Sequence, residues 1–397
     1  MSHLSYLEKL LDGVEVEWLP LKDVLVRTKG TKITAGQMKT LHKDGAPLKI
    51  FAGGKTVAFV DFKNIPEKDV NREPSIIVKS RGVIEFEYYE KPFSHKNEMW
   101  SYYSDNNAIH IKFIYHFLKL HERHFQGIGS RMQMPQIATP DTDNFFVPIP
   151  CPDNPEKSLA IQSEIVRILD AFTAMTAELT AELNMRKKQY NYYRDQLLSF
   201  EDGEVEWKTL GEVATLRRGR VMSKGYLEEN SGEYPVYSSQ TAKNGMIGSI
   251  DTFDFDGEFI SWTTDGANAG TVFYRTGKFS ITNVCGLIKI NDESKLIYKY
   301  LYYWLTIEAQ KHVYSGMGNP KLMSHQVEKI PVPIPCSGNE ERSLNKQQRI
   351  VAILDKLEAL TFSITEGLPR EIELRQKQYE YYRDLLLSFP KSEEAVA

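Results

Sequence analysis

A fifteen-residue segment that occurs twice constrains this chain more than any other feature of its sequence. Residues 186–200 and 375–389 are identical at twelve positions, at an offset of 189 residues. Neither copy contains Gly or Pro, and apolar or aromatic side chains stand at Tyr190, Tyr193 and Leu197. Spacings of three and four residues predict an amphipathic helix in each copy. A duplication this close predicts a chain built from two related halves.

The repeat extends well beyond this helix. Residues 15–18 match residues 204–207 at the same offset, and residues 162–170 share six positions with residues 347–355 at an offset of 185. The order along the chain is therefore globular, helical, globular, helical. The predicted segments are 1–150, 151–203, 204–335 and 336–397.

The N-terminus carries a further partial copy of the repeat. Residues 6–11 resemble residues 193–198, so the chain starts with the tail of a helical unit. This predicts a nearly circular arrangement, in which the N-terminal helix packs near the end of the last helix.

Both globular segments alternate short β-like runs with Gly-rich turns. Between their matched ends they share little sequence. The predicted fold class is α+β, with two mixed α/β domains joined by two long helices in a pseudo-two-fold, circular repeat. Strands are predicted at residues 56–60, 75–78, 83–86, 259–262, 271–274 and 285–290, and helices at 112–124 and 294–310.

Each globular segment ends in a proline-rich stretch. Prolines at 148, 150, 331, 333 and 335 cannot continue a helix or a central strand, so we interpret both stretches as stiff, extended linkers. Each leads into a long helix with apolar residues at alternating spacings of four and three, which is typical of a coiled-coil seam. In the first helix these residues include Ile165, Ile168, Phe172, Met175, Leu179 and Leu183, and in the second Val351, Leu354, Leu357, Leu360 and Ile364.

Two local features mark the helical segments. The first contains a tandem of Thr-Ala-Glu-Leu at residues 176–179 and 180–183. Four residues turn a helix by about 400°, so one unit can be added or lost while the apolar face is nearly kept and the helix length changes by about 6 Å. The second segment contains Gly367 and Pro369, which predict a kink or a break.

Composition places the chain among ordinary globular proteins and excludes several classes. Hydrophobic residues make up 41% and charged residues 26%, and no apolar run approaches the roughly 18 residues of a membrane span. The N-terminus lacks the pattern of a signal peptide, and three cysteines without metal-type spacing favour a reducing cytoplasm. The net charge of −4 means that any nucleic-acid contact must come from local basic clusters.

The catalytic motifs that can be tested are incomplete. Residues 53–56 resemble the end of a phosphate loop, but Lys49 stands where the first Gly is required. Residues 121–124 lack the spacing of a zinc-binding HExxH helix, and the triplet at 61–63 is too short to define a nuclease site. We therefore expect no catalytic residue and no metal site in this chain.

Polar, basic and Gly-rich loops are the best candidates for a binding surface. Arg and Lys neutralise phosphates, and Arg, Asn and Gln can read base edges. In the first globular segment the candidates are Arg27, Lys29, Lys32, Lys55, Lys79, Arg81, Lys96, Arg131 and Gln133. In the second they are Arg217, Arg218, Arg220, Ser239, Gln240, Lys243, Asn244, Asn268, Asn319 and Lys321.

The layout of two variable globular segments, each followed by a proline-rich exit and a repeated helix, resembles the specificity (S) subunit of type I restriction–modification enzymes. The Thr-Ala-Glu-Leu tandem and the repeated Tyr-Tyr-Arg-Asp-x-Leu-Leu-Ser-Phe helix ends look most similar to the IC branch. The resemblance covers essentially the whole chain.

This resemblance implies a function and a set of partners. Each globular segment would be a target recognition domain that reads one half of a bipartite, asymmetric target in double-stranded DNA. The two helices would form an antiparallel coiled coil that sets the gap and docks two modification (M) subunits. Those subunits would bind S-adenosylmethionine and methylate adenine, and restriction (R) subunits, joined through the core of two M subunits and one S subunit, would use ATP and Mg. The chain itself would hold no cofactor and contact no membrane.

Two alternatives stay open at this point. One is a self-contained DNA methyltransferase or nuclease, which would need a cofactor or metal site. The other is a coiled-coil scaffold without any role on DNA.

Overall fold

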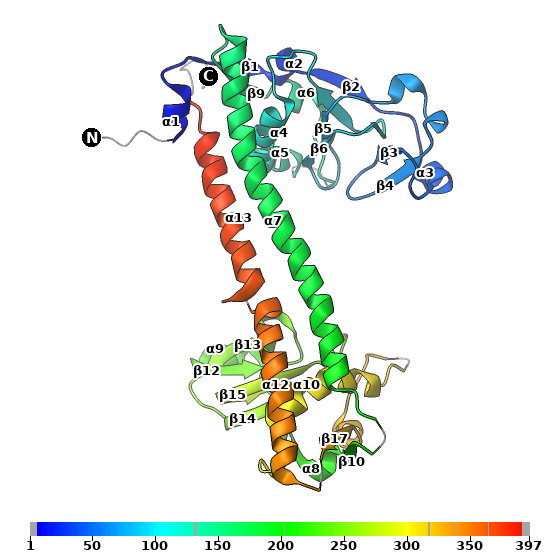
Figure 1. The fold of residues 1–397 in the computed structure, drawn as a ribbon, viewed down its shortest axis with the longest axis vertical. Coiled ribbons are helices and arrows are strands. Elements are labelled where there is room, and N and C mark those ends of the chain that lie inside the picture. Colours follow the sequence, from blue (N-terminus) through cyan, green and yellow to red (C-terminus); the bar gives the residue numbers. More distant parts are fainter. Residues whose placement is uncertain are drawn as a thin grey trace, which may run out of the picture. The chain divides into compact units, whose positions relative to one another are not determined.

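The chain folds into two compact units (Figure 1). The computed structural model describes residues 6–130, 133–201, 203–316, 318–336, 338–363 and 365–390. Unit 1 comprises Met1–Leu179 and Ile372–Ala397, and unit 2 comprises Thr180–Glu371. Each unit therefore contains one globular segment and parts of both helical segments.

Unit 1 is built on a small mixed core of three sheets. One sheet has the strand order β2-β8-β5-β6, a second has the order β4-β3-β7, and a two-stranded ladder joins β1 to β9. The strands are β1 (Val16–Pro20), β2 (Val26–Lys29), β3 (Leu48–Phe51), β4 (Val57–Val60), β5 (Ser75–Lys79), β6 (Glu85–Tyr89), β7 (Phe93–His95), β8 (Trp100–Tyr103) and β9 (Phe146–Pro150). The helices are α1 (Tyr6–Leu11), α2 (Leu21–Val24), α3 (Ala35–Leu41), α4 (Ile111–Leu120), α5 (Glu122–Gly129) and α6 (Thr139–Asp143).

Unit 2 places its strands in one larger sheet and one ladder. The sheet order is β11-β16-β14-β15-β12-β13, and β10 pairs with β17. The strands are β10 (Val205–Thr209), β11 (Ala214–Arg218), β12 (Ser231–Tyr237), β13 (Met246–Ile250), β14 (Phe255–Thr263), β15 (Val272–Ile281), β16 (Cys285–Ile290) and β17 (Pro331–Pro335). The helices of this globular part are α8 (Leu210–Val213), α9 (Lys224–Glu229), α10 (Tyr298–Glu308) and α11 (Ser324–Val327).

The two sheets follow the same plan, although the residues inside them differ. The order β2-β8-β5-β6 in unit 1 corresponds to β11-β16-β14-β15 in unit 2. Strand β15 also pairs in parallel with β12, just as β7 pairs in parallel with β3. In unit 1 the strand that corresponds to β15 is divided into β6 and β7, and Pro92, which lacks a backbone N–H, lies in the interruption. The repeat predicted from the helices thus extends through the globular interiors.

The predicted strands are found, with boundaries shifted by a few residues. The predicted helix at 112–124 is observed as two helices, because α4 ends at Leu120 and α5 starts at Glu122. The helix predicted at 294–310 begins later, at Tyr298. Local patterns therefore located the elements well and their ends less well.

The interpretation of the proline-rich stretches as linkers was wrong. Residues 146–150 and 331–335 are the strands β9 and β17, which pair antiparallel with β1 and β10. Among the described residues each ladder has two strands, so both are edge strands. A proline can therefore be tolerated where its position lacking an N–H faces away from the partner strand. The registers are equivalent, with Val16 opposite Pro150 and Val205 opposite Pro335. Each ladder therefore ties the start of a globular segment to its end.

The helical segments are α7 (Pro155–Leu197), α12 (Glu340–Phe362) and α13 (Gly367–Leu386). The predicted break in the second segment is confirmed, because α12 ends at Phe362 and α13 starts at Gly367, which has φ 76° and is followed by Pro369 in the first turn. A Cβ on Gly367 would lie 2.5 Å from the carbonyl oxygen of Ala359, so only glycine fits there. Ile364, which the seam pattern included, lies outside the described residues.

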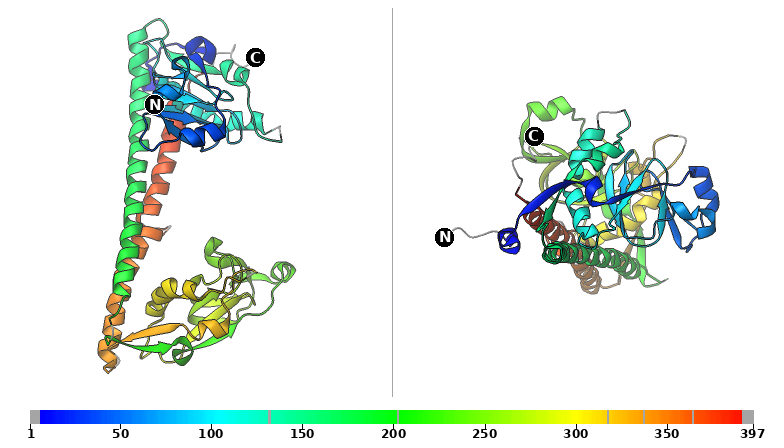
Figure 2. Two further views of the ribbon diagram at one scale, coloured as in Figure 1. Left: turned by 90° about the vertical axis from the view of Figure 1, so that its right-hand side faces the viewer. Right: turned by 90° about the horizontal axis from the view of Figure 1, so that it is seen from above.

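Within each unit the two helical segments pack against one another. In unit 1, Phe172 stacks on Tyr382 with ring centroids 5.2 Å apart, and Figures 1 and 2 show α13 beside α7 there. In unit 2, Tyr190 contacts Phe362 while Lys346 lies over the ring of Phe200, so the later part of the first segment meets the earlier part of the second. The pairing is therefore antiparallel.

The N-terminal helix packs where the repeat predicted. Leu7 and Leu11 of α1 are buried in the same apolar core as Leu386, Leu387 and Phe389 at the end of the last helix. The Tyr6 hydroxyl also donates to Glu164 of α7, at 3.3 Å. Unit 1 thus contains two helix ends of the repeated type, one from each terminus of the chain.

Candidate nucleic-acid interface

In each unit one buried glutamine of the long helix is hydrogen-bonded to the globular segment and so fixes the position of that segment on the helix. Gln162 of α7 accepts a hydrogen bond from the backbone N–H of His110 and donates to Ala108 O and Ser158 Oγ, all at 2.9–3.0 Å. Gln347 of α12 makes the same three bonds, to Ile297 N, Lys295 O and Ser343 Oγ. Both side chains are completely buried.

An ion pair beside each glutamine repeats this connection. Lys112 of α4 lies 2.7 Å from Asp170 of α7, and Lys299 of α10 lies 2.8 Å from Asp355 of α12. A second side chain of the short helix also reaches each carboxylate. It is His116 in unit 1 and Tyr303 in unit 2.

In unit 1 the predicted loops converge on one another. Strands β2, β3, β5 and β7 end there and β8 begins there. Thr31 forms a parallel bridge with Lys96, whose N–H donates to Phe51 O at 2.9 Å. The buried Ser80 hydroxyl donates to Glu98 O at 2.6 Å, and the Ile137 N–H donates to Ser80 O at 3.0 Å. We call this set of loops, at residues 27–32, 51–55, 79–84, 95–99 and 133–137, loop cluster 1.

Unit 2 has the same set of backbone and hydroxyl hydrogen bonds. Arg220 forms a parallel β-bridge with Thr282, whose N–H donates to Tyr237 O at 2.9 Å. The buried Thr264 hydroxyl donates to Val284 O at 2.9 Å, and the Leu322 N–H donates to Thr264 O at 2.9 Å. We call the corresponding loops, at residues 217–221, 237–245, 263–271, 281–285 and 314–322, loop cluster 2.

The shared scaffold carries different side chains in the two units. Arg81 forms an antiparallel bridge with Gln136 in loop cluster 1, and the corresponding bridge in loop cluster 2 joins Asp265 to Lys321. A backbone bond supports each bridge, from Gly82 N to Pro135 O and from Gly266 N to Pro320 O. Two sites of equal geometry thus present different chemistry.

The predicted residues of unit 1 fall into exposed and paired groups. Lys29, Lys32, Lys55 and Gln133 are exposed on loop cluster 1. The others have contacts: Arg27 lies 3.2 Å from Asp143, Lys96 lies 2.6 Å from Glu98, and Arg81 Nε lies 3.2 Å from Met134 Sδ. Arg131 lies outside the described residues.

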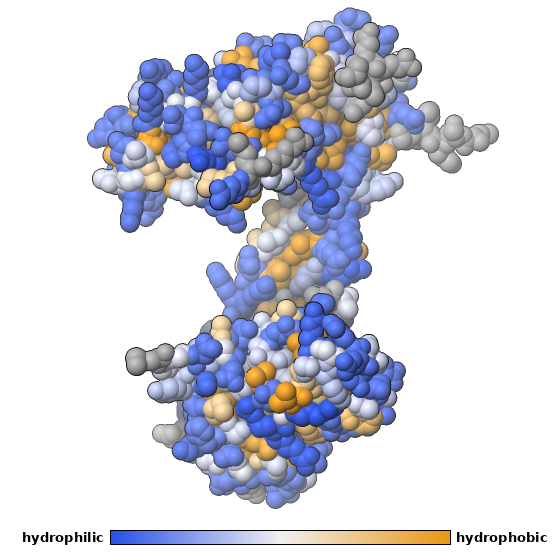
Figure 3. Space-filling model, turned by 180° about the vertical axis from the view of Figure 1, so that it is seen from behind, coloured by the Kyte–Doolittle hydropathy of each residue, from blue (hydrophilic) through white to orange (hydrophobic). Residues whose placement is uncertain are grey.

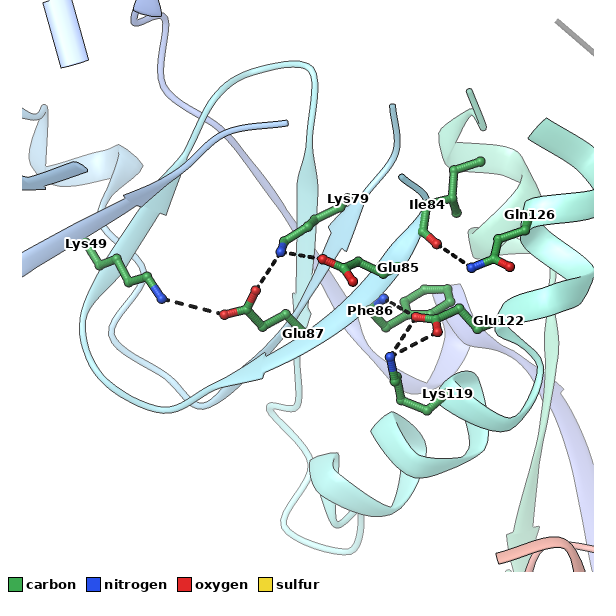
Figure 4. Close-up of polar contacts among 9 residues, drawn as sticks. All are labelled: Lys49, Lys79, Ile84, Glu85, Phe86, Glu87, Lys119, Glu122 and Gln126. Atoms are coloured by element: carbon green, nitrogen blue, oxygen red, sulfur yellow. Dashed lines mark hydrogen bonds and ion pairs between the residues drawn. The ribbon is translucent and has the colours of Figure 1, made fainter. Parts of the chain in front are cut away.

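Lys79 differs from the rest of the predicted set because it is buried. Its ammonium lies 2.6 Å from Glu85 and 2.8 Å from Glu87, and Figure 4 shows it between the two carboxylates. Glu87 also lies 3.6 Å from Lys49. Burial opposes the charged form, but the two carboxylates more than offset it and raise the pKa of Lys79. Its charge is therefore satisfied within the protein by these two carboxylates.

A second polar group in Figure 4 supports the same strand. Glu122 of α5 accepts hydrogen bonds from the backbone N–H of Phe86 and from Lys119 Nζ, each at 2.9 Å. Gln126 donates to Ile84 O at 3.0 Å. These contacts hold the β5–β6 turn of loop cluster 1 against α5.

The predicted residues of unit 2 all lie in loop cluster 2. Arg217 is exposed, Arg218 donates to Asn283 O at 2.7 Å, and Arg220 lies 3.0 Å from Asp254. Lys243 and Asn244 stand at an exposed turn with left-handed backbone, φ 49° and 53°. Gln240 donates to Met246 O at 2.6 Å, Lys321 lies 3.8 Å from Asp265, Ser239 and Asn268 are half-buried, and Asn319 is exposed.

Arg275 is a residue that sequence reasoning missed. It lies on β15 and is 5% exposed, with its guanidinium 3.6 Å from the ring centroid of Tyr237. Its Nε donates to Ser261 Oγ at 3.0 Å, while one terminal nitrogen has no hydrogen-bond partner among the residues that the structure describes. Burial lowers the pKa of Arg275 to about 10. A single arginine in a strand gives no sequence signal of this kind, because the contact with Tyr237 joins two strands that are far apart in the sequence.

No cluster of metal-ligating side chains occurs among the described residues. Over the same part of the chain, none of the helices has the length and apolarity that crossing a bilayer requires. The face drawn in Figure 3 is mostly hydrophilic, with smaller apolar patches.

Together these features define a two-fold repeated scaffold with two similar loop clusters that carry different side chains. The family model of the type I restriction modification DNA specificity domain matches residues 15–186 and again residues 203–374. The chain therefore belongs to the family of type I restriction–modification DNA specificity subunits. As such a subunit it is the non-catalytic component of its system.

Two relatives cover nearly the whole chain. The chain is 42% identical to the specificity subunit of the type I restriction enzyme EcoR124I/EcoR124II from Escherichia coli, over 99% of each chain. It is 36% identical to the specificity subunit of the type I restriction enzyme EcoprrI from Escherichia coli, over 92% of this chain and 93% of the other.

A solved structure shows the same fold at low sequence identity. The S subunit of the type I restriction–modification system from M. genitalium superposes with a TM-score of 0.62 over 96% of this chain and 98% of its own. Its sequence is only 16% identical, so this likeness concerns the fold alone.

Proposed function

We propose that each loop cluster reads one half of a bipartite, asymmetric sequence in double-stranded DNA. The proposal assigns residues 1–150 and 204–335 as the two target recognition domains and the helices as the element that sets the unread gap. Exposed cations such as Lys29, Lys55 and Arg217 would contact phosphates, and the more polar residues would contact base edges.

One observation carries this proposal. The buried hydroxyls of Ser80 and Thr264 hold the same backbone framework in both units, while the bridged pairs above them differ in charge. Two loop clusters with the same backbone arrangement would each approach DNA in the same way. Because their side chains differ, the two half-sites would have different sequences.

We further propose that the repeated helices dock two modification subunits. Tyr192 and Tyr381 occupy equivalent positions of the repeat and are 61% and 65% exposed. Exposed aromatic side chains of this kind are typical of protein–protein contacts. The partners would supply S-adenosylmethionine binding, and restriction subunits would supply ATP- and Mg-dependent steps, in the cytoplasm. Placement in the IC-like branch stays a prediction.

Methylation mapping tests the reading of half-sites. The chain is expressed with its modification subunits, and methylated adenines are located by single-molecule sequencing. We expect the double substitution Asp265→Arg and Lys321→Gln, which places the unit 1 pair on the unit 2 scaffold, to change one half of the methylated motif. The matched variant with Arg81→Asp and Gln136→Lys should change only the other half. A change in both halves, or in neither, contradicts the proposal.

The same mapping tests the gap. One additional Thr-Ala-Glu-Leu unit inserted after Leu183 lengthens the helix by about 6 Å, which corresponds to about one to two base pairs. We expect the two half-sites to stay the same while the gap grows by that amount. An unchanged gap would contradict the role of the helices.

A further inference from the structure

In unit 1 a groove between two helix ends is filled by the N-terminal helix. Leu386 and Phe389, at the end of α13, are 1% and 6% exposed, and they share a core with Leu7 and Leu11 of α1. The hydrogen bond from Tyr6 to Glu164 places α1 against α7 as well, and Figures 1 and 2 show α1 beside both helices. One short amphipathic helix therefore covers the junction of α7 and α13 in this unit.

In the part of the chain that the structure describes, no helix covers the equivalent groove in unit 2. Leu197 and Phe200 correspond to Leu386 and Phe389 through the repeat, but both remain only partly buried. Ile353 is 36% exposed, whereas its counterpart Ile168 is partly buried in the core of unit 1. A cavity of about 560 Å³ lies between the end of α7, with the residues that follow it, and α12. The repeat thus leaves one of its two grooves open.

The two grooves differ in charge. In unit 2 the cavity is lined by Arg342, Lys346 and Arg349, together with a single acidic residue, Glu204. The positions that correspond to these three cations in unit 1 are Lys157, Ile161 and Glu164, which have no net charge. Among the described residues, none of the three cations of unit 2 has an ion pair. An occupant of this groove must therefore bring its own negative charge.

We propose that the groove between the end of α7 and the first turns of α12 binds an acidic, amphipathic helix of a modification subunit. The proposal rests on the proposed function, in which the helices dock such subunits. Helix α1 shows the form of the occupant, with apolar residues four positions apart that enter the groove. Carboxylates on the flanks of the helix pair with Arg342 and Arg349. Because α1 already fills the groove of unit 1, only one of the two docked subunits is held in this way.

Site-specific photo-crosslinking of the full chain with its purified modification subunit tests the contact. Benzoylphenylalanine is placed at position 349, and in a matched control at the corresponding position 164. We expect the label at 349 to form an adduct with an acidic helical peptide of the modification subunit. The label at 164 should instead join α1 of the same chain. If the label at 349 joins a second copy of this chain, or forms no adduct while the modification subunit is bound, the inference is wrong.

Charge reversal provides a second readout. We expect Arg342→Glu with Arg349→Glu to weaken binding of the modification subunit at least tenfold, with the difference shrinking at high salt. Lys356→Glu is the matched control, since Lys356 is exposed on α12 outside the groove. Circular dichroism and thermal unfolding establish that all variants fold. Equal affinities for the two variants overturn the inference. Failure of the unchanged chain to bind a modification subunit would instead contradict the proposed function itself.

Discussion

Unit 1 and unit 2 fill the same place in their sheets with one tryptophan, but on different strands. In unit 1, Trp100 of β8 stands opposite Val78 of β5. In unit 2, Trp262 of β14 stands opposite Gly286 of β16. The large residue lies on β8 in unit 1 but on β14, the counterpart of β5, in unit 2. The two strands have thus exchanged their large and small residues. The comparison teaches that the fold repeats through complementary volume, and that residue identity at any one position need not repeat.

The glycine is a necessary part of this exchange. A Cβ on Gly286 would lie 2.0–2.3 Å from three atoms of the Trp262 ring, which no side chain can tolerate without movement. Each indole N–H also finds its own acceptor, the Thr142 hydroxyl for Trp100 and the Leu322 carbonyl for Trp262. Each tryptophan therefore fits only with its own small partner. A tryptophan at both positions of one pair would overfill the core.

The largest expected effect comes from breaking this pair. Trp262→Val should destabilise unit 2 by about 3–5 kcal/mol, because it leaves a cavity in the core. Gly286→Trp alone should also destabilise, because it overpacks the same space. The double variant reproduces the arrangement of unit 1 and should recover at least half of the combined loss.

Hydrogen exchange of peptides from β14 and β16 in denaturant measures these changes, and peptides from β5 and β8 serve as an internal reference. If the double variant loses as much stability as the sum of the losses of the two single variants, the large and the small residue cannot exchange positions in this core.

The two buried glutamines, Gln162 and Gln347, are expected to contribute equally to the stability of the two units. Gln162→Leu and Gln347→Leu each leave a backbone N–H, a carbonyl and a serine hydroxyl without their partner. We expect each to cost about 2–3 kcal/mol, because unpaired buried polar groups lose the whole desolvation energy.

The measurement is local hydrogen exchange at residues 106–112 for the first variant and 294–300 for the second. If the two substitutions lower the stability by amounts that differ by more than about 1 kcal/mol, the hydrogen bonds of Gln162 and Gln347 are not equivalent in energy.

On DNA, the comparison can be tested with one cation from each unit. Lys29 and Arg218 occupy equivalent positions of the repeat on β2 and β11. If each contacts one phosphate, replacement by Ala should weaken binding by up to about tenfold and reduce the slope of log affinity against log salt by about 0.9.

The assay is fluorescence anisotropy of the assembled complex on its target at several salt concentrations, with Lys356→Ala as the control outside both loop clusters. Unchanged salt slopes would remove these two residues from the interface.

The smallest expected effect concerns pH and distinguishes His116 from Tyr303. Burial lowers the pKa of His116 below its ordinary value of 6.5, although the hydrogen bond to Asp170 partly opposes this. The folded state therefore binds the proton less readily than the unfolded state. His116 costs no stability above pH 7 and destabilises unit 1 as the pH falls below about 6.5.

We expect this loss to be below about 1 kcal/mol and to disappear in His116→Tyr, which places the unit 2 residue in unit 1. Thermal unfolding between pH 7.5 and 5.5 measures it. Equal acid sensitivity of the variant and the unchanged chain would assign the effect to other groups, such as the buried His95, whose pKa burial also lowers.

The repeated helix was the most informative part of the sequence, because an exact spacing of Tyr190, Tyr193 and Leu197 is retained only where a helix packs the same way twice. It predicted the order of the segments and the place of α1, whereas Gly367 and Pro369 predicted the break in the second helical segment. The strands followed from local patterns. The correspondence of the two sheets could not be foreseen, because Trp100 and Trp262 differ by a strand and no alignment of the two interiors would match them.

The candidate site shows the same division. Loop composition identified the segments that form both loop clusters, since Gly and Asn mark turns, whereas the predicted contacts with DNA stay a prediction. It did not distinguish Lys79, which two carboxylates hold inside the protein, from Lys55, which is exposed in a turn. It also misjudged the proline-rich stretches, because the rule against proline in strands applies to central strands, and these are edges.

The ladders β1–β9 and β10–β17 have a consequence for how such chains can change. Each ladder clips the entry of a globular segment to its exit at a fixed separation, set by five paired residues. Whatever sequence lies between the clipped ends, the adjoining helix receives the same two attachment points. An interior can therefore be exchanged as a cassette, and the mechanical frame that carries it need not be rebuilt.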